Sequence, residues 1–141
     1  MNGSEPYWLD ELELEAIHQE VIAASGGLAG IRDRGLLASA LVAPKILWHY
    51  APESSTLLDL AARLAYGLAK NHGFVDGNKR TAFIATYTFL AMNGIVIQAS
   101  QQSVIEAVEA LASSTDKPRQ AQERFAGWLR RVTEATSQDW L

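Results

Sequence analysis

The stretch Thr56–Asn93, TLLDLAARLAYGLAKNHGFVDGNKRTAFIATYTFLAMN, decides how this chain folds. Its first part places leucines and alanines three and four residues apart, which is typical of one face of a helix. Its last part is apolar on several sides, as expected of a helix at the centre of a bundle. The sequence therefore predicts one helix from about Thr56 to His72, ended by Gly73, and another from near Asn78 to a stop at Asn93–Gly94.

Upstream of this stretch, the sequence predicts two more helices. In LDELELEAIHQEVIAA, Asp10 is a candidate N-cap, and Glu13 three residues later would complete a capping box. The apolar residues that fall roughly on one face of this helix are Leu9, Leu12, Ile17 and Val21. The glycines of GGLAGIRDRG then interrupt the pattern, after which Asp33 is expected to cap a short helix that Pro44 stops.

Downstream, the pattern predicts a short extended stretch and two helices. The sequence IVIQ after Gly94 fits one extended segment. A helix is expected from Ser103 to Ala112, with Val104, Ile105, Val108 and Leu111 facing inward. Pro118 suits the first turn of a last helix, which carries Phe125, Trp128, Leu129 and Val132.

The segment PKILWHYAPESS is bounded by prolines and rich in aromatic residues. We interpret Lys45–Glu53 as an extended flap or short β-hairpin. For Trp48 and Tyr50, a position in the core and a position that faces a target protein are equally plausible from the sequence. The expected fold class is all-α: a compact helical bundle of one domain, residues 1–141, with room for one short β-hairpin flap.

Composition narrows the class of protein. A chain of 141 residues with 48% hydrophobic and 20% charged residues fits one soluble globular domain. The net charge of −4 argues against direct nucleic-acid binding. The absence of cysteine excludes disulfides and makes the cytoplasm the expected location. The acidic N-terminus lacks the features of a signal peptide, and no apolar run is long enough to predict a membrane partner.

Polar residues are concentrated between the two central helices, in NHGFVDGNKRTAF. The backbone N–H groups of a helix that begins after Asp76–Gly77 would carry a partial positive charge of about half an electron. Lys79 and Arg80 lie in its first turn, where this charge disfavours cations by roughly 0.3–1 kcal/mol each. An anion would account for them. We therefore expect a phosphate site here, with Asn78 as a further donor.

Two neighbouring side chains suit phosphate chemistry. Asp76 could hold a magnesium ion that also binds phosphate oxygens. His72, at the end of the preceding helix, could take a proton from an attacking hydroxyl. A base, a metal ligand and an anion cradle are the parts of a phosphoryl- or nucleotidyl-transfer site. The bulky Phe74 is expected to anchor the loop in the core.

Structural interpretations compete with this one. A single histidine is more often structural than catalytic, and we expect His18 and His49 to be structural. Asp76, Gly77 and Asn78 alone would also fit a plain turn and helix cap, but that leaves the two cations unexplained. His72 and Asp76 are four residues apart, as zinc ligands on a helix can be, but Gly73 and the missing third ligand argue against zinc.

The segment HGFVDGNKRTAF resembles the signature of the Fic/Doc superfamily, usually His-x-Phe-x-Asp/Glu-Gly-Asn-Gly-Arg. GGLAGIRDRGLLASAL and the order of helices are similar to the Doc (death-on-curing) branch of toxins. Two residues depart from the Fic form: Lys79 replaces the second glycine, and Phe83 replaces a second arginine found in many Fic adenylyl transferases. Both departures are typical of the Doc branch.

The resemblance implies a toxin kinase of a toxin–antitoxin module. It would transfer the γ-phosphoryl group of ATP to a threonine or serine of a translation factor such as elongation factor Tu, which arrests translation. It implies His72 as general base and Asp76 as magnesium ligand. Phosphates would be held by Gly77, Asn78, Lys79 and Arg80. The alternatives are a Fic-type adenylyl transferase that modifies a protein hydroxyl with AMP, and a non-catalytic toxin or regulator that acts by binding.

The resemblance also bears on partners. Many Fic proteins carry an inhibitory Ser/Thr-x-x-x-Glu helix, and this sequence has no such spacing. The Doc branch implies a Phd-type antitoxin that folds on binding into a groove of the toxin. Trp128 and Trp140 are candidates to line that groove. By the same resemblance, Lys45–Glu53 would be the flap that aligns the target by strand addition.

Overall fold

The computed structural model describes residues 4–135 of the chain. In this range it has α1 (Glu11–Ser25), α2 (Arg34–Tyr50), α3 (Leu57–Asn71), α4 (Asn78–Met92), β1 (Ile95–Ile97), α5 (Gln101–Ser113), α6 (Pro118–Val132) and β2 (Thr133–Ala135). The prediction of a helical bundle is confirmed. No helix in this range combines the length and the apolar character needed to cross a membrane.

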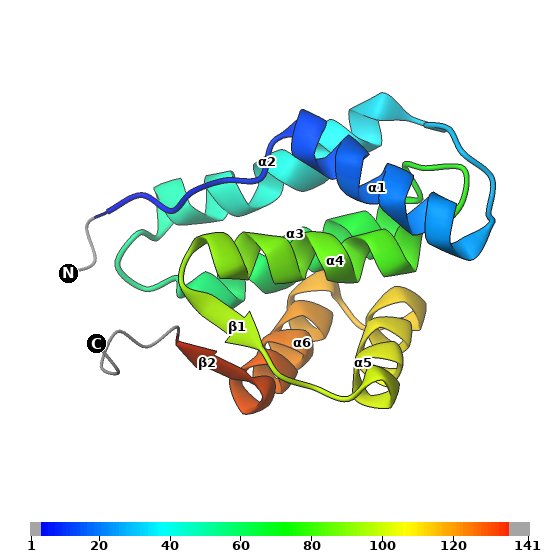
Figure 1. Ribbon diagram of the computed structural model, residues 1–141. Coiled ribbons are helices and arrows are strands. Elements are labelled where there is room, and N and C mark those ends of the chain that lie inside the picture. The colour runs from blue at the N-terminus through cyan, green and yellow to red at the C-terminus, as the bar shows by residue number, and fades with distance from the viewer. Residues whose placement is uncertain (1–3, 136–141) are drawn as a thin grey trace, which may run out of the picture.

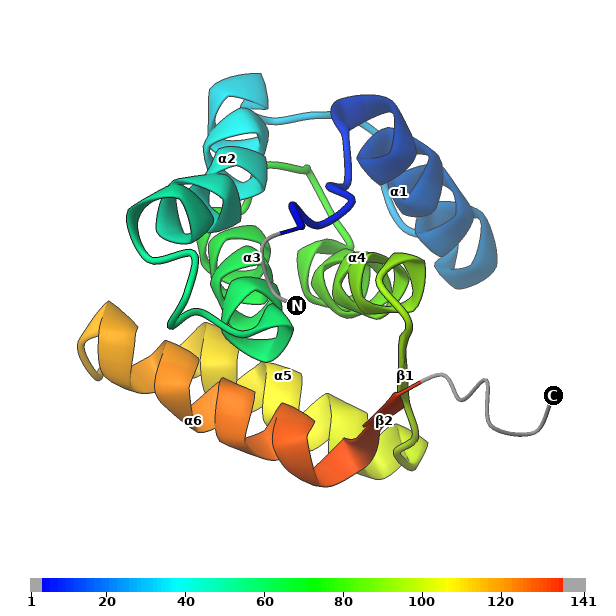
Figure 2. The same ribbon diagram turned by 90° about the vertical axis from the view of Figure 1, so that its left-hand side faces the viewer.

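The helices form three layers. α3 and α4 lie side by side in the middle, α1 and α2 cover one side of them, and α5 and α6 cover the other (Figures 1 and 2). The strands β1 and β2 pair antiparallel, with Val96 opposite Glu134. They are joined through α5 and α6, so they do not form a hairpin. The loop between α3 and α4 lies at the end of the bundle where α1 ends and α2 begins (Figure 1).

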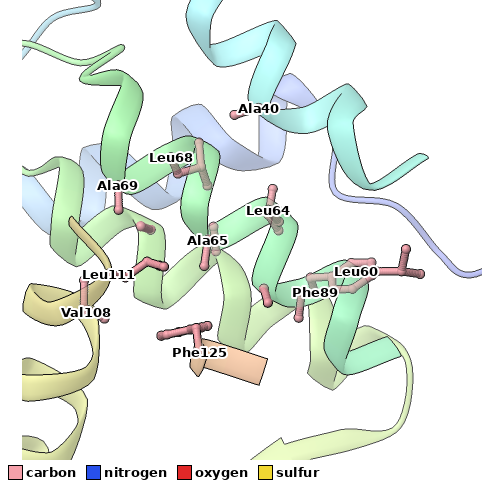
Figure 3. Packing of buried hydrophobic residues seen from close by; sticks show 14 of the residues in the cluster. Ala40, Leu60, Leu64, Ala65, Leu68, Ala69, Phe89, Val108, Leu111 and Phe125 are labelled. Atoms are coloured by element: carbon pink, nitrogen blue, oxygen red, sulfur yellow. The ribbon is translucent and has the colours of Figure 1, made fainter. Parts of the chain in front are cut away.

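The core is built around α3, as its 3–4 pattern predicts. Leu60, Leu64 and Leu68 are at most 3% exposed and belong to one buried cluster with side chains from α2, α4, α5 and α6 (Figure 3). Each buried leucine contributes roughly 1.5–3 kcal/mol. α2 approaches α3 closely, because a Cβ added at Gly67 would lie 2.9 Å from Cβ of Ala40. This tight antiparallel packing brings the start of α2 beside the end of α3.

Helix capping agrees with the sequence. Asp10 accepts a hydrogen bond from the Glu13 amide at 2.8 Å, and the Glu13 side chain accepts one from the Asp10 amide at 2.9 Å. The capping box predicted for α1 is therefore confirmed. The carboxylate of Asp33 accepts from the amide of Leu36 at 3.1 Å and caps α2, as expected.

The flap predicted for Lys45–Glu53 is wrong. α2 continues to Tyr50, and Pro44 lies inside it instead of ending it. A proline within a helix costs about 3 kcal/mol because it removes one hydrogen bond and crowds the preceding turn. Pro44 is buried on the same face as Leu37 and Leu41, and the packing of this face on α3 offsets that cost. The local rule for proline was outweighed by tertiary packing.

Some expected core residues are exposed. Leu12 is 79% exposed and Ile105 is 47% exposed. Leu12 lies about 160° around α1 from the buried Leu14, because each residue turns a helix by about 100°. For the same reason, Ile105 lies about 100° away from Val104 on α5. Trp48 is half-buried and meets Trp8 edge-to-face, whereas Tyr50 is 87% exposed.

Candidate active site

The candidate site begins where α3 ends. His72 is the C-cap of α3 and has a left-handed backbone, with φ 52° and ψ 49°. It is the one non-glycine residue with positive φ in residues 4–135. Its imidazole is exposed and makes no hydrogen bond within this range. The histidine is therefore free to meet a substrate, and its direction is set by the backbone.

The loop from His72 to Gly77 is tied to the segment between α1 and α2. Ile31 and Phe74 form an antiparallel bridge, and the amide of Val75 donates to the carbonyl of Gly30 at 3.0 Å. The amides of Arg32 and Asp33 both donate to the carbonyl of Gly73, at 2.8 and 2.9 Å. Two short segments distant in sequence thus support each other like strands.

Phe74 and His18 hold the loop from the side of the core. Phe74 is 2% exposed, which confirms that it anchors the loop in the core. The buried imidazole of His18 stacks on its ring, with centroids 3.7 Å apart and an angle of 5° between the planes. Nε2 of His18 lies 2.8 Å from the carbonyl oxygen of Asp76, the distance of a hydrogen bond that Nε2–H would donate. His18 is structural, as predicted, and what it supports is the candidate site.

The polar side chains of Asp76, in the loop, and Asn78, at the start of α4, differ in their hydrogen bonds. The amide of Asn78 is occupied: it donates to the carbonyl of Phe74 and accepts from its N–H, both at 3.0 Å. The carboxylate of Asp76 accepts one amide on each oxygen, from Gly77 at 2.9 Å and from Leu28 at 3.1 Å. A carboxylate has about four acceptor positions, so Asp76 keeps capacity for a further ligand.

The cations lie just beyond the loop. α4 begins at Asn78, and no side chain caps its N-terminus, because the N-cap is Gly77. Nζ of Lys79 forms an ion pair with Oε2 of Glu109 on α5 at 2.9 Å, and both side chains are about half exposed. Arg80 is exposed and has no ion pair within residues 4–135. Free amides and two cations at one helix end make a suitable site for an anion.

The sequence of this region is shared with known proteins. The model of the Fic/DOC family matches residues 8–90, which include α1, α2, α3, the whole loop and most of α4. The chain belongs to the Fic/DOC family. The family match ends within α4, so the strands and the layer of α5 and α6 lie outside it.

Two curated relatives are similar over part of this Fic/DOC chain. "Toxin Doc" of Mycolicibacterium smegmatis is 45% identical over 76 residues, which cover 54% of this chain and 58% of the relative. "Protein kinase doc" of Escherichia phage P1 is 36% identical over 86 residues, which cover 60% of this chain and 67% of the relative. The chain therefore matches about three fifths to two thirds of the length of these relatives.

The site does not resemble a preformed metal cage. Residues 4–135 contain no cluster of three or more histidine, cysteine or acidic side chains that could hold a metal. One carboxylate with spare acceptor positions, beside an anion site, fits magnesium, which is usually held by one or two carboxylates and substrate oxygens.

Sequence reasoning missed the residues that hold this Fic/DOC loop from outside. They are His18, Leu28 and Arg32, together with Glu109, which holds Lys79. GGLAGIRDRG contained a signal, because a polar, glycine-rich stretch between two helices is a common place for supporting backbone contacts. Gly27 illustrates this, since an added Cβ would lie 2.7 Å from Oδ2 of Asp76.

Proposed function

We propose that this chain is a Doc-type toxin with protein kinase activity. It would transfer the γ-phosphoryl group of ATP to a threonine or serine hydroxyl of a translation factor such as elongation factor Tu. The observation that carries the proposal is Lys79 in the first turn of α4, which no side chain caps, three residues after Asp76 and seven after His72 in the sequence. The names of the two relatives, a toxin and a protein kinase, support it. The choice of translation factor rests on the resemblance to the Doc branch.

The anion cradle would hold the phosphates of ATP. The backbone amides at the start of α4 and the side chains of Lys79 and Arg80 would bind phosphate oxygens. Asn78 would contribute its backbone amide, because its side chain is already bonded to Phe74. Asp76 would hold magnesium, whose charge neutralises the phosphates and favours departure of the leaving group. Lysine fits the γ-phosphate better than glycine does, since it adds a cation where the transition state gathers charge.

The transfer itself needs one proton acceptor. The target hydroxyl oxygen forms a bond to the γ-phosphorus, and the bond from this phosphorus to the bridging oxygen of ADP breaks. The proton of the hydroxyl passes to His72, which then releases it to solvent. ADP is the leaving group, and the cradle would still hold its β-phosphate when the bond breaks. Most of the rate enhancement would come from positioning and charge neutralisation.

The proposal extends to partners and location. We propose a cytoplasmic toxin controlled by a Phd-type antitoxin, with residues 1–141 acting as one Fic/Doc-like domain. Trp128 lines a groove of about 440 Å³ between α5 and α6, together with Phe125 and Arg131. Its indole N–H donates to Oγ of Ser103 at 2.9 Å, and the side chain is 9% exposed. Trp140, the other predicted groove residue, lies outside the described residues.

The decisive experiment follows the transferred group. Purified protein is incubated with magnesium, elongation factor Tu and ATP labelled at either the α or the γ position. The kinase predicts label on the factor from the γ position alone. Label from the α position alone would overturn the proposal and establish an adenylyl transferase, which would share His72, Asp76 and Arg80.

A cell-based arm separates catalysis from binding. Expression of the wild-type chain should arrest growth, and His72→Ala should not. A His72→Ala protein that is folded and still arrests growth would favour the third possibility, a non-catalytic toxin or regulator. If labelled ATP marks another protein in a bacterial extract and not elongation factor Tu, the kinase stands and its target must be revised.

A further inference from the structure

Arg32 reaches from the segment before α2 to the end of α3. Its Nε donates to the carbonyl of His72 at 2.6 Å, and its Nη2 donates to the carbonyl of Asn71 at 3.0 Å. The amides of Arg32 and Asp33 donate to the next carbonyl, that of Gly73. The two-residue unit Arg32–Asp33 therefore satisfies three successive carbonyls, one of which belongs to the candidate base.

The end of α1 shows how a helix usually ends. Gly26 is left-handed there, with φ 75°, and its amide donates to the carbonyl of Ile22 at 2.8 Å. Glycine is favoured at this position because it has no Cβ. At the end of α3 the left-handed residue is His72, and no amide of its own caps the helix. The guanidinium of Arg32 supplies the missing donors, and its positive charge suits the negative end of the helix dipole.

The left-handed residue of this turn is followed by a glycine in a tightly packed position. The following Gly73 is required by its neighbour, because a Cβ there would lie 2.4 Å from Cδ2 of Leu37. The left-handed residue of this turn is His72, in a conformation that L-residues adopt at a cost. Strained residues of this kind persist where surrounding contacts hold them, and they concentrate at functional sites.

A base needs a fixed direction, and His72 has no partner for its ring within residues 4–135. Catalytic histidines are usually oriented by a third group bonded to the other ring nitrogen. Within residues 4–135, the His72 ring can be oriented only through its own backbone. Arg32 holds this backbone by its hydrogen bond to the His72 carbonyl. In the part of the chain that the structure describes, the hydrogen bonds of Arg32 reach neither Asp76 nor Lys79. Its hydrogen bonds go to the carbonyls of Asn71, His72 and Gly73, the residue before the candidate base, the base itself and the residue after it.

We propose that Arg32 is a positioning residue for the His72 base. The inference rests on the proposed function for its kinetic consequence and on geometry alone for its structural consequence. Loss of the guanidinium would release the carbonyls of Asn71 and His72, and the backbone of His72 would relax from its left-handed conformation. The base would then be misplaced while the phosphate cradle stayed intact.

The kinetic test uses Arg32→Ala, Arg32→Lys and Arg34→Ala. Arg34 is a matched control, because it lies two residues away and pairs with Glu11 and Glu15, outside the loop. Arg32→Ala should lower kcat by about 10- to 100-fold, since a misplacement of about 1 Å can cost this much. The KM for ATP should stay within about twofold. Arg32→Lys, which restores one donor, should recover part of kcat, and Arg34→Ala should match the wild type.

A spectroscopic test does not depend on activity. The chain has three histidines, so the imidazole carbon–proton signals of His72, His18 and His49 can be separated by NMR. Arg32→Ala should shift the ring signal of His72 and move its 13Cα signal away from the left-handed value. The His18 signal, which reports the stack on Phe74, should stay in place and show that the fold is intact.

The two tests together separate the failures. Unchanged His72 signals in Arg32→Ala would overturn the inference, even for an active kinase. A raised KM with unchanged kcat would also overturn it, as would an equal loss of activity in Arg34→Ala. If the wild-type chain transfers no phosphoryl group, the proposed function fails, and the NMR result alone decides the inference. If Arg32→Ala does not fold, Arg32→Lys carries both measurements.

Discussion

The two halves of the candidate site are held in different ways. The loop from His72 to Gly77 is tied by bonds from α1, from the segment before α2 and from Asn78. Its anchor Phe74 is buried. The cations that follow are exposed, and one surface ion pair, between Lys79 and Glu109, is all that holds them within residues 4–135.

This difference suits the two tasks that we propose. A base and a metal ligand must be placed accurately relative to the attacking hydroxyl, and rigid support from surrounding residues provides this. Phosphates are recognised largely by charge, and lysine is a flexible point charge that can follow them. The held half should therefore be sensitive to small changes in packing, and the exposed half should be sensitive mainly to charge.

The largest effect is expected at the base. His72→Ala should lower kcat for γ-phosphoryl transfer by about 10²- to 10⁴-fold, the usual contribution of a general base. The fold should remain, because the imidazole is exposed and makes no hydrogen bond within residues 4–135. His49→Ala is the matched control, since His49 is also exposed but lies on α2. Near-normal transfer by His72→Ala would show that this half of the site is not catalytic.

The next effect tests how tightly the held half is packed. Gly73→Ala should lower the free energy of unfolding by about 1–3 kcal/mol, because its Cβ would overlap Leu37. Urea denaturation followed by circular dichroism measures this. Gly26→Ala separates packing from backbone strain, since Gly26 has φ 75° but no neighbour within 4 Å of an added Cβ. A larger loss for Gly26→Ala than for Gly73→Ala would contradict tight packing of the loop.

The elements of this site could be predicted from the sequence because their signals are local. The two central helices follow from spacings of three and four residues, and the loop follows from its glycines. The position of the cations in the first turn of α4 follows as well, because Lys79 comes directly after Asp76, Gly77 and Asn78. Each of these inferences needs no more than about twenty neighbouring residues.

The support of the site could not be predicted, because it comes from distant residues. Arg32 is 40 positions from His72 and His18 is 58 positions from Asp76, and no local pattern pairs them. The wrong flap has the same origin: the proline rule is local, and the burial of Pro44 against α3 is not. Tertiary packing decided both the course of α2 and the rigidity of the loop.

Removal of charge from the exposed half should have a smaller effect than loss of the base. Lys79→Gly should lower kcat/KM for phosphoryl transfer by about 10- to 100-fold, because a hydrogen bond to a charged group is worth roughly 1.5–3 kcal/mol. Lys79→Ala is the control, because it removes the charge without the helix-weakening effect of glycine. Initial rates at several ATP concentrations measure this. Equal activity of both variants and the wild type would show that Lys79 does not bind phosphate.

The smallest effect is expected at the partner of Lys79. An ion pair between half-exposed side chains contributes about 0–1 kcal/mol, so Glu109→Gln should hardly change stability. If Glu109 competes with phosphate for Lys79, its loss should lower the KM for ATP by up to about fivefold at low salt. At about 1 M salt, where charges are screened within about 3 Å, the difference should vanish.

Glu106→Gln is the control for that measurement, because Glu106 lies on the same helix and bonds to Gln102. A higher KM in Glu109→Gln would reverse the interpretation: Glu109 would then hold Lys79 in place for phosphate, as Arg32 is proposed to hold His72. In that case both halves would be positioned by neighbouring side chains, and they would differ only in the number of supporting contacts. A lower KM would mean that ATP displaces the carboxylate of Glu109 from Lys79 when it binds. The exposed half would then be held only weakly before ATP arrives.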